Sequence, residues 1–150
     1  MSTQRTLNAG APANSKGGLH ALEVILDSTQ ILSSDGVTVA GFAAGDVYSM
    51  PLVDGMGFLS GLIYTNATWT GNIDIGVGAQ YADSTNILNG GTPAAAGGAI
   101  SMATLLNVTT TQIGSLTGTN YLNITIKSAN TIGKLTISLL AHTVTRALAG

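Results

Sequence analysis

Few side chains of this sequence are suited to catalysis. The chain has two histidines, His20 and His142, and no cysteine. A chain without cysteine has no thiolate nucleophile, no disulfide and no thiolate metal site. Serines are plentiful, but no Gly-x-Ser-x-Gly turn is present to expose one of them as a nucleophile. Both histidines fall at expected strands, where a solvent-facing imidazole is the simpler interpretation, so we expect no Ser-His-Asp site.

Two pairs of carboxylates remain as candidates for acid–base or metal chemistry. Asp74 and Asp83 form one pair, and Asp46 and Asp54 form the other. The second pair flanks an expected strand, so its members would lie at opposite ends and could not share a proton or a water. No Asp-x-Asp-x-Asp-Gly run supplies the closely spaced oxygen ligands of a calcium loop. We therefore expect no metal ion, no cofactor and no enzymatic activity.

Two aromatic residues could instead form a binding platform. Trp69 is the single tryptophan of the chain, and Tyr64 precedes it closely in the sequence. Aromatic rings of this kind can stack on a sugar, although one tryptophan in a β domain more often belongs to the core or to an interface. A glycan-binding site built on Trp69 and Tyr64 therefore stays open as an alternative.

The composition excludes several classes of protein. Only 8% of the residues are charged, against roughly a quarter in an average domain. The net charge of −2 provides no basic face for nucleic acid. Hydrophobic residues make up 45% of the chain, which argues against disorder. Asn, Thr and Gly interrupt every long uncharged stretch, and no apolar run follows Arg5, so we expect no membrane span and no signal peptide.

From Leu19 onward the hydrophobic residues recur with a period of two, which predicts β-strands. In the last two of them, Leu122 and Leu135 begin series of inward-facing residues at alternate positions. Turn signals such as Ser34–Gly36 and Asn89–Gly91 separate the strands. A further short strand near Ile31 or Val37 brings the total to about eight, which indicates an all-β fold of two packed antiparallel sheets. The expected strands are 21–26, 47–53, 58–64 with its even-numbered residues on one face, 72–78, 99–106, 121–127 and 134–146.

Residues 1–18 differ from the rest of the chain. They show no period and are rich in Gly, Ala and Asn, so this segment cannot pack on its own. Fully extended, it would reach about 60 Å. We therefore expect a flexible or extended N-terminal arm, residues 1–18, followed by one β-sandwich domain, residues 19–150.

The polar positions of the expected strands are occupied by Thr, Ser, Asn and Gly rather than by ions. Neutral groups cost less to remove from water than charged ones, and charges are depleted at the centres of protein interfaces. Much of this surface is therefore expected to meet other protein, as in an assembly subunit or a binding module.

Several segments between Gly45 and His142 follow the pattern of a known family. The pattern is an Asp-Val strand ending in a proline turn, then an Ile-Gly-x-Gly strand and loop, then a closing Gly-Lys strand pair. In these respects the chain resembles the small capsid decoration proteins (cement or head-fibre proteins) of tailed bacteriophages. Where that family often has Gly-Asp-Gly, this chain has Gly76-Val77-Gly78. The segments that carry the resemblance are Gly45–Val53, Phe58–Thr65, Ile73–Asn86, Asn123–Ile126 and Gly133–Leu139.

The resemblance implies a jelly-roll-like β-sandwich on the outer surface of a phage head, made in the host cytoplasm and bound where subunits of the major capsid protein meet. It implies a homo-oligomer, most often a trimer, that stabilises the assembled lattice by binding to it. Arg5, Leu7 and Lys16 of the arm are the candidate capsid contacts. The alternative is a glycan- or receptor-binding sandwich of a phage fibre or spike, with Trp69 and Tyr64 in its site.

Overall fold

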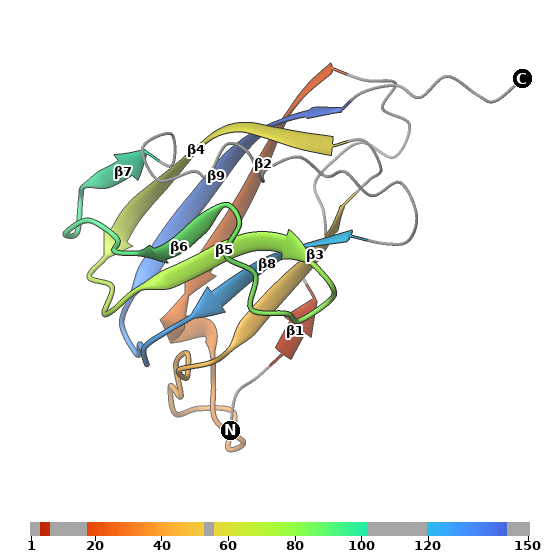
Figure 1. Cartoon of the computed structure of the whole chain (residues 1–150). Coiled ribbons are helices and arrows are strands. Elements are labelled where there is room, and N and C mark those ends of the chain that lie inside the picture. The colour runs from red at the N-terminus through yellow and green to blue at the C-terminus, as the bar shows by residue number, and fades with distance from the viewer. Residues whose placement is uncertain (1–3, 7–17, 53–55, 102–119, 144–150) are drawn as a thin grey trace, which may run out of the picture.

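In the computed structural model, which describes residues 4–6, 18–52, 56–101 and 120–143, two β-sheets pack face to face (Figure 1). A 3-10 turn, Ser28–Gln30, follows the first long strand. Sheet A consists, in spatial order, of β1 (Gln4–Thr6), β3 (Val47–Leu52), β8 (Asn120–Ile126), β5 (Ile73–Gly78) and β6 (Leu88–Gly91). Sheet B consists, in spatial order, of β2 (Gly18–Asp27), β9 (Lys134–Thr143), β4 (Met56–Ala67) and β7 (Ala99–Ser101).

Strands β2 to β9 have the connectivity of a jelly roll. The orders β3-β8-β5-β6 and β2-β9-β4-β7 place most consecutive strands in opposite sheets, with antiparallel neighbours throughout. This is the eight-stranded double sheet of jelly-roll proteins. Strand β1 is an addition, and it runs parallel to β3. The prediction of an all-β antiparallel sandwich of about eight strands is confirmed.

The core lies between the two sheets and follows the predicted alternation most closely in β8 and β9. Leu122, Ile124 and Ile126 of β8 are completely buried, and the odd-numbered residues from Leu135 to Ala141 face them from β9. Burial of such aliphatic side chains stabilises a fold by about 1.5–3 kcal/mol each. At one end the ring of Phe42 packs against Tyr48, so the core is aromatic there. These strands form where the sequence places β-branched and aliphatic residues at every second position.

Strand β4 departs from the predicted alternation. Phe58 pairs with Ala141 and Ser60 with Leu140, so β4 has one extra residue at this point. Such a bulge shifts the alternation by one position. Phe58 is therefore buried, whereas Leu62 and Tyr64 are exposed on the other face of the sheet. The prediction that all four even-numbered residues share a face is wrong.

Two other expected elements also differ. Asn89–Gly91, expected as a turn, belongs to β6, which pairs with β5 through Leu88 and Gly91. Asn89 and Gly90 form a bulge there, and Gly90 has a φ of 64° that glycine adopts readily. In place of a strand near Ile31 there is an isolated bridge between Leu32 and Val39. Residues 53, 102–106 and 144–146, also expected in strands, lie outside the described residues.

Candidate functional site

The chain itself covers the outer face of sheet A. Residues 79–87, which we call the covering loop, connect β5 to β6 and cross over Gly76. A Cβ atom added at Gly76 would lie 2.5 Å from the carbonyl carbon of Ser84, so only glycine allows this approach. The Asn86 side chain holds the loop in place. Its Oδ1 accepts a hydrogen bond from Val77 N at 2.7 Å, and its Nδ2 donates to Val77 O at 3.1 Å. Strand β5 is consequently buried on both faces from Ile73 to Gly76.

Neutral polar side chains of sheet A find their partners in this loop. Ser49 and Asn123 lie on neighbouring strands and are completely buried. Ser49 Oγ donates to Asn123 Oδ1 at 2.5 Å and accepts from Tyr81 N at 2.8 Å. Asn123 Nδ2 donates to Ala79 O at 2.8 Å and to Ser84 Oγ at 3.1 Å. Because both side chains are hydrogen-bonded, their burial avoids the cost of unpaired polar groups.

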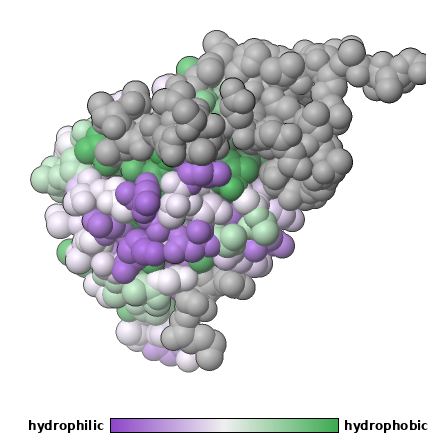
Figure 2. Space-filling model, viewed as in Figure 1, coloured by the Kyte–Doolittle hydropathy of each residue, from purple (hydrophilic) through white to green (hydrophobic). Residues whose placement is uncertain are grey.

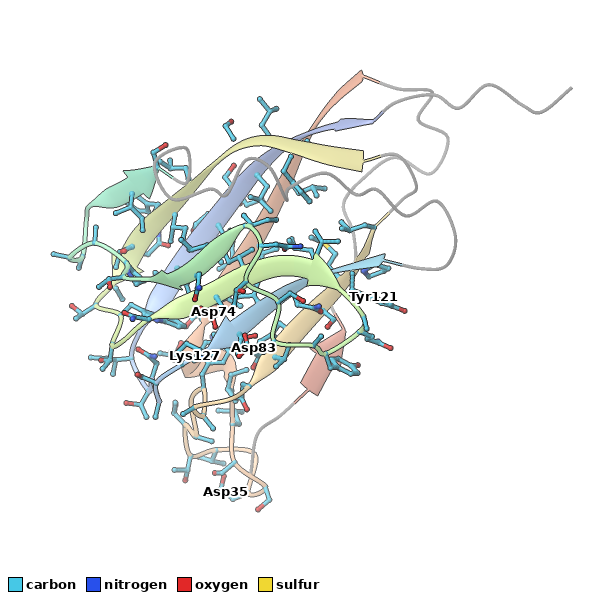
Figure 3. All side chains as sticks on the ribbon, in the orientation of Figure 1. Asp35, Asp74, Asp83, Tyr121 and Lys127 are labelled. Carbon is cyan, nitrogen blue, oxygen red and sulfur yellow. The ribbon has the colours of Figure 1, made fainter. Side chains whose placement is uncertain are left out.

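Three of the chain's few charges meet beside the covering loop (Figure 3). Lys127, directly after β8, places its Nζ 2.8 Å from Asp83 Oδ2 and 3.1 Å from Asp74 Oδ2. The other oxygen of Asp74 accepts a hydrogen bond from Gly90 N at 2.6 Å. The side chain of Asp74 is only 4% exposed, against 41% for Lys127 and 46% for Asp83. Polar side chains also gather across the middle of this face in the space-filling view (Figure 2).

The structure thus brings together Asp74 and Asp83, one of the two carboxylate pairs singled out in the sequence. The ammonium group of Lys127 bridges them and offsets one of their two negative charges, so Asp74 and Asp83 both form ion pairs within the fold. This cluster ties the covering loop to β8 and, through Asp74, to the bulge of β6. We call these three residues the lysine clasp. No sequence motif identified its lysine, because the two partners of Lys127 come from β5 and from the covering loop, both remote in the sequence.

Within the lysine clasp, the pKa values of Asp83 and Lys127 are shifted in opposite directions. The hydrogen bond from Lys127 lowers the pKa of Asp83, and the hydrogen bonds to Asp83 and Asp74 raise the pKa of Lys127. A lowered carboxyl pKa stabilises the fold above the unfolded value, about 3.9, and that contribution is lost as the pH falls through the folded value. A raised lysine pKa stabilises the fold below the unfolded value, about 10.4, and that contribution is lost as the pH rises through the folded value.

We therefore expect the stability difference between the wild-type protein and Lys127→Met to depend on pH. The difference in free energy of unfolding should be constant from about pH 5 to pH 9, and smaller below about pH 4 and above about pH 10. Urea denaturation of both proteins across this range measures it. A difference that stays the same down to pH 2.5 would contradict the role assigned to Asp83.

The remaining candidates for chemistry are placed apart from this cluster. Asp46 is buried and accepts a hydrogen bond from Ala43 N at 2.8 Å, which stabilises the turn before β3. Its proposed partner, Asp54, lies outside the described residues. His20 and His142 occupy register positions in β2 and β9, opposite Ala141 and Leu19 respectively. The side chains of both histidines lie outside what is described.

The structure does not bring Trp69 and Tyr64 together. Trp69 is 7% exposed and packs in the core against Phe42, with ring centroids 5.6 Å apart. Tyr64 lies on the outer face of sheet B and is 39% exposed. A platform for a sugar needs an exposed ring face, which the buried Trp69 does not offer.

Within the described ranges, no three His, Cys, Asp or Glu side chains gather as ligands for a metal ion. A cavity of about 330 Å³ opens beside the end of β2, with mainly apolar residues such as Ile31 and Phe42 in its lining. The one carboxylate of the lining, Asp27, is paired with Lys134 at 3.4 Å. In the same ranges, no helix has the length and apolar character needed to cross a membrane.

The outer face of sheet B is the exposed counterpart of the covered face of sheet A. No described segment lies across it, and four of its large apolar side chains are well exposed: Ile25 (55%), Leu62 (44%), Tyr64 (39%) and Leu140 (37%). Glu23 is a charged residue of this face, and the register pair that follows Ile25 and Thr136, Asp27 with Lys134, forms an ion pair at 3.4 Å. We define this outer B face by three rows of paired residues: Ala21, Leu140 and Ser60; Glu23, Ser138, Leu62 and Ser101; Ile25, Thr136, Tyr64 and Ala99.

The arm residues singled out in the sequence are only partly described. Arg5 lies in β1, at the register position opposite Tyr48 of β3. Leu7 and Lys16 lie outside the described residues.

Comparison with known proteins adds one structural likeness. No protein-family model matches the chain. No curated protein sequence matches it either. Among solved structures, a chain from the capsid of Ralstonia phage GP4 has the same fold, with a TM-score of 0.57 and 13% sequence identity. The alignment covers 95% of this chain and 99% of that chain, so the likeness extends over the whole domain. At this identity it is the jelly-roll fold that the two chains share.

Proposed function

We propose that this protein is a non-catalytic structural protein of a phage virion, which binds the outer surface of the head and stabilises the lattice of the major capsid protein. The observation that carries the proposal is the end-to-end likeness to a chain from a phage capsid. Because the alignment covers nearly all of both chains, that chain has about the same size as this one. A domain of this size fits a decoration or cement protein, added to a shell that larger subunits form.

The two faces of the sandwich support this function. The outer face of sheet A is closed by the covering loop, and its charged clasp suits contact with water. The three rows of the outer B face hold one charged residue, Glu23, and several exposed apolar side chains, whose burial gains about 25 cal/mol per Å². Exposed apolar groups on one face are typical of a surface that contacts protein. We therefore assign the outer B face to contacts with neighbouring virion proteins, including other copies of this chain in a homo-oligomer, for which we favour a trimer.

Such a protein acts by linkage and needs no reaction. A molecule that binds the assembled lattice, and not its separated subunits, stabilises the lattice by an amount that grows with the concentration and affinity of that molecule. Many copies repeat modest contacts over the shell, which multiplies their effect.

Binding to phage heads tests the proposal. The purified protein is expected to cosediment with expanded heads of its phage and to raise the temperature at which those heads release DNA. The double variant Leu62→Lys/Leu140→Lys should bind more than about tenfold more weakly, because charges would be buried in an apolar contact. Both side chains are exposed, so the fold should be retained.

The control is Thr85→Lys, which adds a charge at an exposed position of the covering loop and should leave head binding unchanged. If the double variant binds heads as tightly as the wild-type protein, the assignment of the outer B face is wrong. No binding by the wild-type protein to any form of the head would contradict the function itself. Arg5, Leu7 and Lys16 stay proposed arm contacts, and the same assay with a chain lacking residues 1–16 measures their contribution.

A further inference from the structure

The first strand is attached to sheet A by very few contacts. β1 forms three register pairs with β3: Gln4 with Val47, Arg5 with Tyr48, and Thr6 with Ser49. These pairs are parallel, whereas every other pairing between named strands is antiparallel. A segment of three residues does not hold a strand conformation by itself, so β1 depends on the edge that β3 provides.

That edge is the open side of the jelly roll. β8 occupies one side of β3, and without β1 the other side would present unpaired backbone N–H and C=O groups. Such an edge is a template for pairing with a strand of any chain. β1 covers the first half of β3, from Val47 to Ser49, and Pro51 in the second half has no N–H to offer. The edge therefore accepts a short strand at one defined place.

The connection between β1 and the rest of the chain permits more than one origin for that strand. β1 ends at Thr6 in sheet A, and β2 begins at Gly18 in sheet B. The intervening residues 7–17 can span about 40 Å when extended. The three pairs with β3 are the same whether β1 comes from the same chain or from another copy, because they involve only Gln4–Thr6 and Val47–Ser49.

We propose that β1 is exchanged between copies, so that Gln4–Thr6 of one copy pairs with Val47–Ser49 of a second copy in the homo-oligomer. The inference rests on the homo-oligomer of the proposed function. In such an assembly the edge of a neighbour is present at an effective concentration in the millimolar range. Exchange of an identical element is a low-cost way to join copies, since it forms no contact that the single chain lacks. Each copy gives one strand and receives one.

Engineered cysteines test the exchange directly, because the natural chain has none. Gln4→Cys is placed in one chain and Val47→Cys in another, and the two are coexpressed so that mixed oligomers form. Register partners on neighbouring strands lie about 5 Å apart at Cα, within the range of a disulfide. Mild oxidation should give a product at twice the 15.0 kDa of one chain, with one cysteine variant in each half.

The matched control replaces Val47→Cys by Ala96→Cys, which is exposed in the connection between β6 and β7. It should give at least about tenfold less of the mixed product, because no strand holds the two sulfur atoms together. A chain that carries both Gln4→Cys and Val47→Cys shows whether the pair forms within one copy. A disulfide within that chain, together with no mixed product from the separate variants, would overturn the exchange.

This test is independent of head binding. A protein that is monomeric by light scattering, on its own and on heads, would overturn the exchange and leave the capsid function in place. The mixed product without any head binding would support the exchange and contradict the capsid function.

Discussion

Replacement of Gly41 by alanine is expected to destabilise the protein by about 4 kcal/mol, the sum of backbone strain and steric overlap. Gly41 has a φ of 71°, a left-handed conformation in which a side chain is unfavourable. A Cβ atom there would lie 2.0 Å from the carbonyl oxygen of Asn130 and 2.8 Å from Cα of Thr131. Both are backbone atoms, so the overlap cannot be relieved by rotating a side chain. The carbonyl of Asn130 also accepts from Phe42 N at 2.7 Å, so its displacement would break the bridge beside the aromatic core.

Gly36→Ala separates the two causes. Gly36 has nearly the same φ, 73°, but no atom lies within 4 Å of the added Cβ. This variant should lose only about 1–2 kcal/mol, the cost of the left-handed conformation alone. Urea denaturation of the three proteins measures both losses. Equal losses of stability for Gly41→Ala and Gly36→Ala would show that the close contact of Gly41 with the backbone of Asn130 and Thr131 is unimportant for stability.

Replacement of Lys127 by methionine is expected to have the second large effect. The variant keeps most of the side-chain volume but leaves the buried carboxylate of Asp74 without its cation. Loss of one partner from a buried ion pair costs about 3–5 kcal/mol. Lys127 is 41% exposed and screened by water, so we expect a smaller loss of about 2 kcal/mol. Part of this loss reflects release of Asp83, and with it the covering loop, from β8.

Lys134→Met is the matched control for the clasp. Lys134 is equally exposed at 41%, and its one carboxylate partner, Asp27, lies 3.4 Å away and is itself more exposed than Asp74. An isolated surface pair of this kind contributes less than about 1 kcal/mol. Hydrogen exchange gives a local test, since the amide of Gly90 donates to Asp74 at 2.6 Å and should exchange faster in Lys127→Met alone. Similar losses of stability in both lysine variants would contradict the special role of the clasp.

Much of the fold was predictable from local patterns. The period of two in 121–127 and 134–146 predicted β8 and β9, and their inward residues from Leu122 to Ala141 are those of the core. A strand pattern depends on neighbours two residues apart, so it is visible in the sequence. The bulge at Phe58 could not be predicted from the sequence, because both faces of β4 carry apolar residues. Either register would therefore bury apolar side chains. Whether Leu62 is exposed is decided by the pairing of β4 with β9.

The candidate site was less accessible from sequence. The carboxylate pair of Asp74 and Asp83 could be picked out in the sequence, but Lys127, the third residue of the lysine clasp, could not. Lys127 is remote from both in the chain and reaches them only because β8 lies beside β5. Two glycines in β5, Gly76 and Gly78, were the only sequence features that indicated the covering loop, because glycine permits the close approach of another segment. Sequence alone does not say which segment approaches.

The scarcity of charge is the property that the sequence determined by itself. It led us to expect no nucleic-acid partner, and it predicted that the neutral polar side chains on the strands would meet other protein. Only the tertiary structure decided which protein buries them. On sheet A it is the chain's own covering loop, whose backbone and side chains pair with Ser49 and Asn123. On sheet B the described outer face keeps exposed apolar side chains, among them Ile25 and Leu62. The physical reason is that a buried polar group needs a hydrogen-bonding partner at a defined distance, and such distances between remote segments exist only after the sheets have packed.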